Sequence, residues 1–113
     1  MAKSEQPRES VIQRAALEYL SYRGIFCFRI NQQGVPLHDG SGGFRPSPTR
    51  GISDILGILP DGRFLAVEIK RPNNNALTDA QRLFLEQAEE HGGVALVIHD
   101  LDELESDLKK KGY

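Results

Sequence analysis

Residues 51–72, GISDILGILPDGRFLAVEIKRP, decide the fold of this chain. Two apolar runs, residues 52–59 and residues 64–69, are rich in β-branched and aliphatic side chains, which are typical of strands. Between them, Pro60-Asp61-Gly62 has the composition of a tight turn, because proline presets φ and glycine accepts a positive φ. We therefore predict a central β-hairpin.

Three charged side chains interrupt these apolar runs: Asp54, Glu68 and Lys70. Because side chains alternate between the faces of a strand, Glu68 and Lys70 share a face, and a hairpin can bring Asp54 beside Glu68. Two adjacent carboxylates repel each other unless a cation or a proton lies between them. Oxygen ligands suit a hard cation such as Mg²⁺, so this trio fits metal-assisted hydrolysis of a phosphodiester. The alternative is an exposed ion pair between Glu68 and Lys70 on a half-solvated sheet.

Length and composition indicate a single domain, residues 1–113, of ordinary globular type. No apolar run approaches the roughly 20 residues of a membrane span, and the polar N-terminus lacks the apolar segment of a signal peptide. The lone Cys27 excludes an intramolecular disulfide and a cysteine-based zinc site. We expect a cytoplasmic protein.

The net charge of −2 argues against a protein that coats DNA by bulk positive charge. The charge is unevenly distributed: residues 1–50 carry seven Lys and Arg against four Asp and Glu, whereas residues 51–113 carry seven against twelve. A bound metal would offset part of the acidic excess of the second half.

The remaining segments complete an α/β fold. Apolar side chains at helical spacing predict a helix between Pro7 and Gly24, and alternation predicts a strand over residues 25–31. A second helix is expected after Thr78, a strand over residues 94–99, and a last amphipathic helix beyond it. A strand, a crossover helix and a further strand form a parallel pair, so we predict a mixed four-stranded sheet flanked by helices.

Residues 32–50 are dominated by glycine, proline and serine and show no periodicity. A loop this long in a small domain is often functional. Its Arg45 and Arg50 can contact phosphate. Alternatively, it is a surface loop or a segment exchanged with a partner subunit.

Two further polar residues, Gln81 and Glu9, each have a purely structural interpretation beside a functional one. Gln81 completes a capping box with Thr78, in which its side chain bonds back to the helix terminus. Glu9 lies in the first turn of the first helix, where the helix dipole favours an acid. Neither role requires catalysis.

The chain resembles the virus-type replication-repair nuclease (VRR-NUC) family of the PD-(D/E)xK nuclease superfamily. The resemblance rests on four features in this order: Glu9, Gly51-x-x-Asp54, Glu68-x-Lys70 and Gln81. Ser53 stands where that signature often has proline. The resemblance implies a restriction-endonuclease-like αβββαβ core.

The resemblance also implies the roles of individual residues. Asp54, Glu68, Glu9 and the backbone carbonyl of Ile69 would hold Mg²⁺ or Mn²⁺. Lys70 would position the attacking water or stabilise charge on the phosphate, and Gln81 would orient the water or the lysine. DNA contacts are expected from four arginines: Arg45, Arg50, Arg71 and Arg82.

Small stand-alone relatives, often of phages, resemble Holliday junction resolvases and form dimers. We therefore expect a homodimeric, metal-dependent, structure-selective DNA endonuclease that cuts Holliday-junction-like or flap DNA in DNA repair, in a bacterial or phage-infected cell. Two alternatives stay open: a nuclease without junction preference, such as a nickase or an exonuclease, and a non-catalytic DNA-binding or assembly module.

Overall fold

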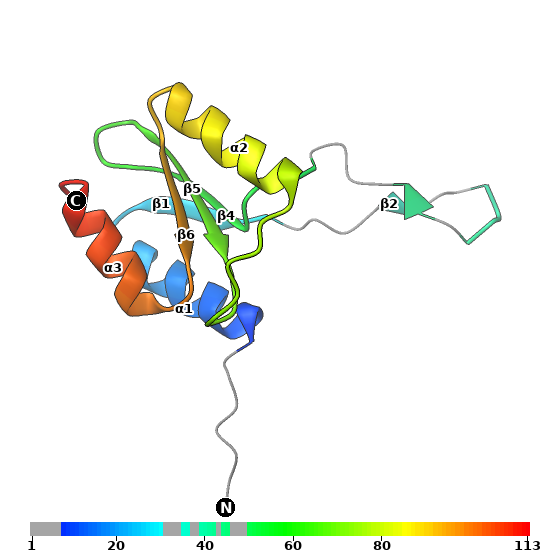
Figure 1. Ribbon diagram of the computed structural model, residues 1–113, viewed down its shortest axis with the longest axis horizontal. Coiled ribbons are helices and arrows are strands. Elements are labelled where there is room, and N and C mark those ends of the chain that lie inside the picture. The colour runs from blue at the N-terminus through cyan, green and yellow to red at the C-terminus, as the bar shows by residue number, and fades with distance from the viewer. Residues whose placement is uncertain (1–7, 31–34, 37–38, 43, 46–49) are drawn as a thin grey trace, which may run out of the picture.

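The computed structural model describes residues 8–30, 35–36, 39–42, 44–45 and 50–113, with only the backbone for residues 35, 36, 44 and 45. The elements, in chain order, are α1 Glu9–Tyr22, β1 Phe26–Arg29, β2 Val35–Pro36, β3 Phe44–Arg45, β4 Ile55–Ile58, β5 Phe64–Ile69, α2 Asp79–Glu90, β6 Val94–Ile98 and α3 Leu101–Lys110 (Figure 1).

The main sheet has four strands in the order β1-β4-β5-β6. β1 pairs antiparallel with β4, and β4 pairs antiparallel with β5, whereas β5 and β6 run parallel. The β4–β5 turn is tight: the amide of Gly62 donates to the carbonyl of Leu59, and Gly62 adopts φ +90°. This arrangement confirms the predicted mixed four-stranded sheet with flanking helices, and it is consistent with a PD-(D/E)xK-like core.

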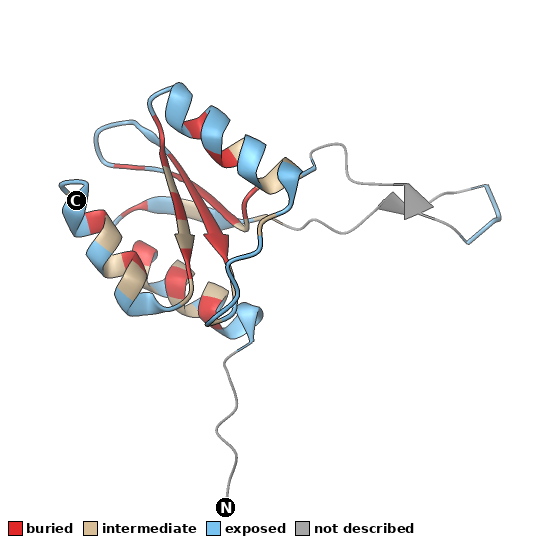
Figure 2. Ribbon diagram, viewed as in Figure 1, coloured by how far each residue is buried: buried red, intermediate tan, exposed pale blue. Residues whose placement is uncertain are grey.

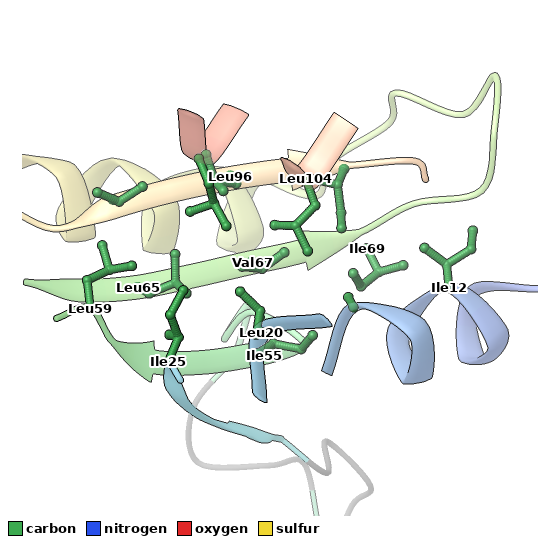
Figure 3. Packing of buried hydrophobic residues seen from close by; sticks show 14 residues of the cluster. Ile12, Leu20, Ile25, Ile55, Leu59, Leu65, Val67, Ile69, Leu96 and Leu104 are labelled. Atoms are coloured by element: carbon green, nitrogen blue, oxygen red, sulfur yellow. The ribbon is translucent and has the colours of Figure 1, made fainter. Parts of the chain in front are cut away.

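The helices cover both faces of the sheet, with α1 and α3 together on one face and α2 on the other (Figure 1). The larger core lies beneath α1 and α3, and many of its side chains appear in Figure 3. Its buried members are Ile12, Ala16, Leu20, Ile25, Ile55, Leu59, Leu65, Val67, Ile69, Val94, Leu96, Ile98, Leu104 and Leu108. A smaller cluster beneath α2 contains Leu56, Ala66, Leu85 and Ala88. Within the described residues, no helix is long and apolar enough to span a membrane.

Two local expectations need correction. The strand predicted over residues 52–59 is shorter, Ile55–Ile58, because the amide of Ile69 bonds to the side chain of Asp54 and does not extend the backbone ladder. The predicted loop 32–50 contains a short antiparallel pair, β2 with β3, that its composition did not indicate. Several other residues of this loop lie outside the described part of the chain.

Helix α2 leaves part of its face of the sheet uncovered. The cross-strand neighbours Phe26, Ile58 and Phe64 are 65%, 50% and 40% exposed, and Phe28 is 46% exposed. The burial colouring of Figure 2 contrasts the exposed strand β1 with the buried β5. We call Phe26, Phe28, Ile58 and Phe64 the open sheet face.

Candidate active site

Glu68 is the most buried charged residue of the described chain, at 2% exposure. It lies on β5, which pairs with both β4 and β6. Its Oε1 accepts a hydrogen bond from Nε2 of Gln81 at 3.0 Å, whereas its buried Oε2 has no hydrogen-bond partner. A buried carboxylate oxygen without a partner is costly, so this atom is suited to a ligand that supplies positive charge or a proton.

The surroundings of Glu68 favour its neutral form. Burial raises the pKa of Glu68 from 4.5 to about 8, and the negative charge of the nearby Asp54 adds to the rise. Glu9 raises this pKa further, whereas the positive charge of Lys70 opposes the rise. Without a bound cation, Glu68 therefore carries a proton at neutral pH.

Asp54 is held by the backbone on both sides. It precedes β4, and the register Ile55–Val67 places it opposite Glu68. Its Oδ2 accepts a hydrogen bond from the amide of Ile69 at 2.7 Å, and its carbonyl accepts one from the amide of Ile30 at 2.8 Å. The carboxylate is therefore fixed beside β5, and only the rest of its oxygen lone pairs remain for a ligand.

Lys70 and Gln81 join the end of β5 to the start of α2. The amide of Lys70 donates to the carbonyl of Ile98, which continues the parallel ladder, and its Nζ donates to Oε1 of Gln81 at 3.2 Å. The same Oε1 accepts from the amide of Thr78 at 2.9 Å, while Gln81 Nε2 donates to Glu68. The capping interaction and the contacts with the charged cluster therefore coexist in one side chain.

Replacing Gln81 and Thr78 separately will distinguish these two contributions. Both Gln81→Ala and Thr78→Ala remove half of the capping box, so each should lower the free energy of unfolding by about 1 kcal/mol. Only Gln81→Ala removes the amide that holds Glu68 and Lys70, so only this variant should lose cleavage activity, in part. The measurement pairs urea unfolding with DNA cleavage rates. Equal losses of cleavage in the two variants would mean that Gln81 acts only by capping α2.

Glu9 and the Ile69 carbonyl are less closely associated with the cluster. Glu9 is the exposed first residue of α1, and its influence on the pKa of Glu68 is the weakest of those described above. The side chain of Ile69 is in the core, and its amide bonds to Asp54. No group of three His, Cys, Asp or Glu side chains suited to a metal occurs among the described residues. The predicted ligand roles of Glu9 and the Ile69 carbonyl stay predictions.

The structure describes the side chains of three of the four predicted DNA-binding arginines. Arg71 is exposed and directly follows Lys70, and Arg50 is exposed beside α2. Arg82 is exposed but forms an ion pair with Asp79 on the same helix at 2.5 Å. Arg45 belongs to β3, and its side chain lies outside the described part of the structure. Of the four, Arg71 is nearest to Lys70 in sequence.

Residues just before Asp54 shape the site in a way that sequence reasoning did not foresee. Gly51 has φ +75°, and a Cβ on it would lie 2.2 Å from the carbonyl carbon of Ala80. The loop before β4 therefore packs backbone to backbone against the first turn of α2. Ser53 is fully buried, and its Oγ has no hydrogen-bond partner. The glycine was the one available signal, because it permits both positive φ and close approach.

We expect Gly51→Ala to destabilise the protein by about 2–4 kcal/mol, because the methyl group meets the α2 backbone and the residue must keep a left-handed conformation. Gly62→Ala is a matched control: it also has positive φ, but no atom lies within 4 Å of the added Cβ. It should cost only about 1 kcal/mol. Urea unfolding of both variants checks this, and similar losses in the two would refute the proposed close packing.

The donor atoms of this cluster fit a divalent cation. Asp54 and Glu68 offer the carboxylate oxygens that Mg²⁺ and Mn²⁺ prefer, and the unpartnered Glu68 Oε2 is one of them. Lys70 adds a cation near this acidic pair. The arrangement combines oxygen donors for a metal with a positive charge that can contact an anionic substrate.

A comparison with models of known protein families matches residues 46–100 to the family described as the VRR-NUC domain. A search of curated proteins found no match. The matched range contains five of the six residues that carry the family resemblance: Gly51, Asp54, Glu68, Lys70 and Gln81. It does not include Glu9 or the rest of α1.

Proposed function

Because this chain carries a VRR-NUC domain, a nuclease domain of the PD-(D/E)xK type, we propose that it is a divalent-metal-dependent endonuclease that cuts branched DNA. One observation carries the catalytic part of this proposal: Glu68, buried and with one unpartnered oxygen, lies opposite Asp54 and is linked to Lys70 through Gln81. A purely structural role does not require a buried carboxyl group opposite a second, partly buried one.

In this proposal, Asp54 and Glu68 would hold Mg²⁺ or Mn²⁺, with the Ile69 carbonyl and Glu9 as further donors. The cation, when bound, supplies Lewis acidity toward the phosphate and an activated water. Glu68 would be ionised with a cation bound, because a nearby positive charge favours the charged form of the carboxyl group.

The other residues act on the phosphate and the water. The ammonium group of Lys70 offsets the charge that grows on the phosphate oxygens or orients the water, and Gln81 holds this ammonium in place. Water oxygen bonds to phosphorus, the bond from phosphorus to the 3′ oxygen breaks, and the products are a 5′-phosphate and a 3′-hydroxyl. Arg45, Arg50, Arg71 and Arg82 are proposed to contact the DNA backbone, with Arg82 first leaving Asp79.

The open sheet face supports the homodimer part of the proposal. Four exposed large apolar side chains on one side of a small sheet are typical of a surface that another protein covers. Two copies would present two active sites, which suits paired cuts in a branched substrate. We propose that the enzyme acts on this substrate in DNA repair, in the cytoplasm of a bacterial or phage-infected cell.

Light scattering with size exclusion will test the dimer. The wild type should have twice the monomer mass of 12.6 kDa, and the double variant Phe26→Ser/Phe28→Ser should have the monomer mass. Tyr22→Ser is the control, because Tyr22 is 88% exposed and lies outside the open sheet face. A monomeric wild type would exclude the dimer, and a dimeric double variant would move the contact elsewhere.

Cleavage of a labelled four-way junction beside a matched linear duplex tests the activity. We expect symmetric cuts in the junction that require Mg²⁺ or Mn²⁺ and that disappear in Glu68→Ala. Equal cutting of both substrates would retain a nuclease and reject junction selectivity. Binding without cleavage, with every metal tested, would favour the non-catalytic module.

A further inference from the structure

A pocket of about 340 Å³ lies on α2 beside the candidate active site. Its lining consists of Arg50, Ala80, Leu83, Phe84 and Gln87. Leu83 is 58% exposed, whereas Phe84 is partly buried and packs edge to face on Phe64 with ring centroids 6.4 Å apart. The pocket thus has mainly apolar walls, and one of them is the ring of Phe84, which packs on Phe64.

The pocket and the candidate active site share the first turn of α2. The backbone of Gly51 lies against Ala80, which brings Arg50 to the rim of the pocket. The next residue, Gln81, turns its amide toward Glu68 and Lys70. A chain of nucleotides passing Lys70 can therefore reach the pocket with a neighbouring nucleotide.

The chemistry of the lining fits a nucleotide better than an apolar peptide. A base offers flat apolar faces that pack on aromatic and aliphatic side chains, and its phosphate is an anion that Arg50 can meet at the rim. The volume lies at the small end of the range for ligand pockets. Bases inside an intact duplex have their faces stacked, so only an unpaired base can enter such a pocket.

We propose that this pocket holds an unpaired base next to the scissile phosphate, with Arg50 contacting the phosphate of that nucleotide. The inference rests on the proposed nuclease function and deepens it, because it gives a physical reason for selecting branched DNA. Junctions and flaps present unpaired or easily unstacked nucleotides at the branch, whereas a linear duplex does not.

The test measures binding of branched DNA in the Glu68→Gln background, so that no cleavage occurs. A series of substrates carries a single abasic nucleotide at successive positions around the branch. At one position, removal of the base should weaken binding about 5- to 10-fold, in line with the contribution of stacking one base on a protein side chain.

Leu83→Gln should weaken binding of the intact DNA by a similar factor and should show no further loss with the abasic nucleotide. The two changes would then be coupled, as expected when they remove the same contact. Tyr22→Gln is the control, since Tyr22, like Leu83, is a solvent-exposed helix residue. Tyr22 lies at the end of α1, a helix that does not line the pocket. It should bind as the wild type does and retain the full abasic effect.

Arg50→Ala adds a second readout. It should reduce the slope of log binding constant against log salt by about 1, as expected for one lost phosphate contact. An unchanged slope would remove Arg50 from the proposal.

Other outcomes overturn the proposal. An abasic penalty of the same size in wild type and Leu83→Gln would mean that no base enters the pocket. A lower molar mass of Leu83→Gln would assign Leu83 to a subunit contact instead. If the protein with intact Glu68 cuts the same DNA but shows no coupling, the nuclease stands and the pocket fails. If it neither binds nor cuts DNA, both fail.

Discussion

The metal-free protein is expected to lose stability as the pH rises toward about 8, because Glu68 must then ionise in a buried position. Its pKa is raised from 4.5 in the unfolded chain to about 8 in the folded chain. Below pH 4.5 the group is protonated in both states, and the folded state carries no penalty. Between these two values the folded state binds more protons than the unfolded state, so stability falls with rising pH.

The size of this effect is large for a domain of 113 residues. A pKa difference of this magnitude corresponds to a loss on the order of 4 kcal/mol between pH 4.5 and pH 8, out of the roughly 5–15 kcal/mol that stabilise a typical domain. Urea unfolding in EDTA at several pH values measures it. Glu68→Gln keeps the hydrogen-bonding shape without the titration, so its stability should lack this component.

Glu86→Gln is the control, because Glu86 is exposed on α2 and should keep the wild-type dependence on pH. Adding Mn²⁺ at pH 8 should raise the free energy of unfolding of the wild type, since a ligand that binds the folded state alone stabilises it. It should not raise that of Glu68→Gln, which lacks a carboxylate to bind the cation. Parallel pH curves for wild type and Glu68→Gln would show that Glu68 does not carry the raised pKa.

Substitutions in the charged cluster are expected to remove cleavage in two distinguishable ways. Asp54→Asn and Glu68→Gln should abolish both cleavage and metal binding, because each replaces a carboxylate oxygen that the cation needs. Lys70→Ala should lower the cleavage rate by about 10²- to 10³-fold, as is usual when one charge-stabilising group is lost, while metal binding persists.

Calorimetric titration with Mn²⁺ and cleavage of the branched substrate together separate these cases. The fold should survive in Glu68→Gln, which removes the cost of ionising a buried carboxyl group, and in Asp54→Asn, which removes the negative charge that makes this ionisation harder. Arg63→Ala is a suitable comparison for Lys70→Ala: it removes a basic side chain that bonds to the carbonyl of Gly92, opposite the active-site end of β5. Full activity in Lys70→Ala would exclude Lys70 from the chemistry.

Local signals in the sequence were strong enough to predict most elements and the central grouping. Two apolar runs and a Pro-Asp-Gly turn predict a hairpin, and the two-residue period of a strand puts Glu68 and Lys70 on the same face. A hairpin can bring Asp54 beside Glu68, and the observed register does so. The capping box at Thr78 is equally local, and both of its hydrogen bonds form.

Composition was a weaker guide where no period exists. The pairing of β2 with β3 depends on contact between two short segments across a loop. Strands of two residues are too short to show an alternation of apolar and polar side chains. The sequence also did not predict that Phe26 and Phe28 are exposed, because an apolar strand face has the same sequence pattern whether or not a helix covers it.

The sequence by itself determined the order of the helices and the main-sheet strands, the central hairpin, the cap at Thr78 and the grouping of Asp54, Glu68 and Lys70, because these follow from contacts between residues close along the chain or from strand periodicity. The tertiary structure alone decided the protonation of Glu68, the double role of Gln81 and the contact of Gly51 with Ala80. Each of these depends on how closely α2 packs against the ends of β4 and β5. Desolvation and long-range hydrogen bonds exist only after that packing, so no local pattern encodes them.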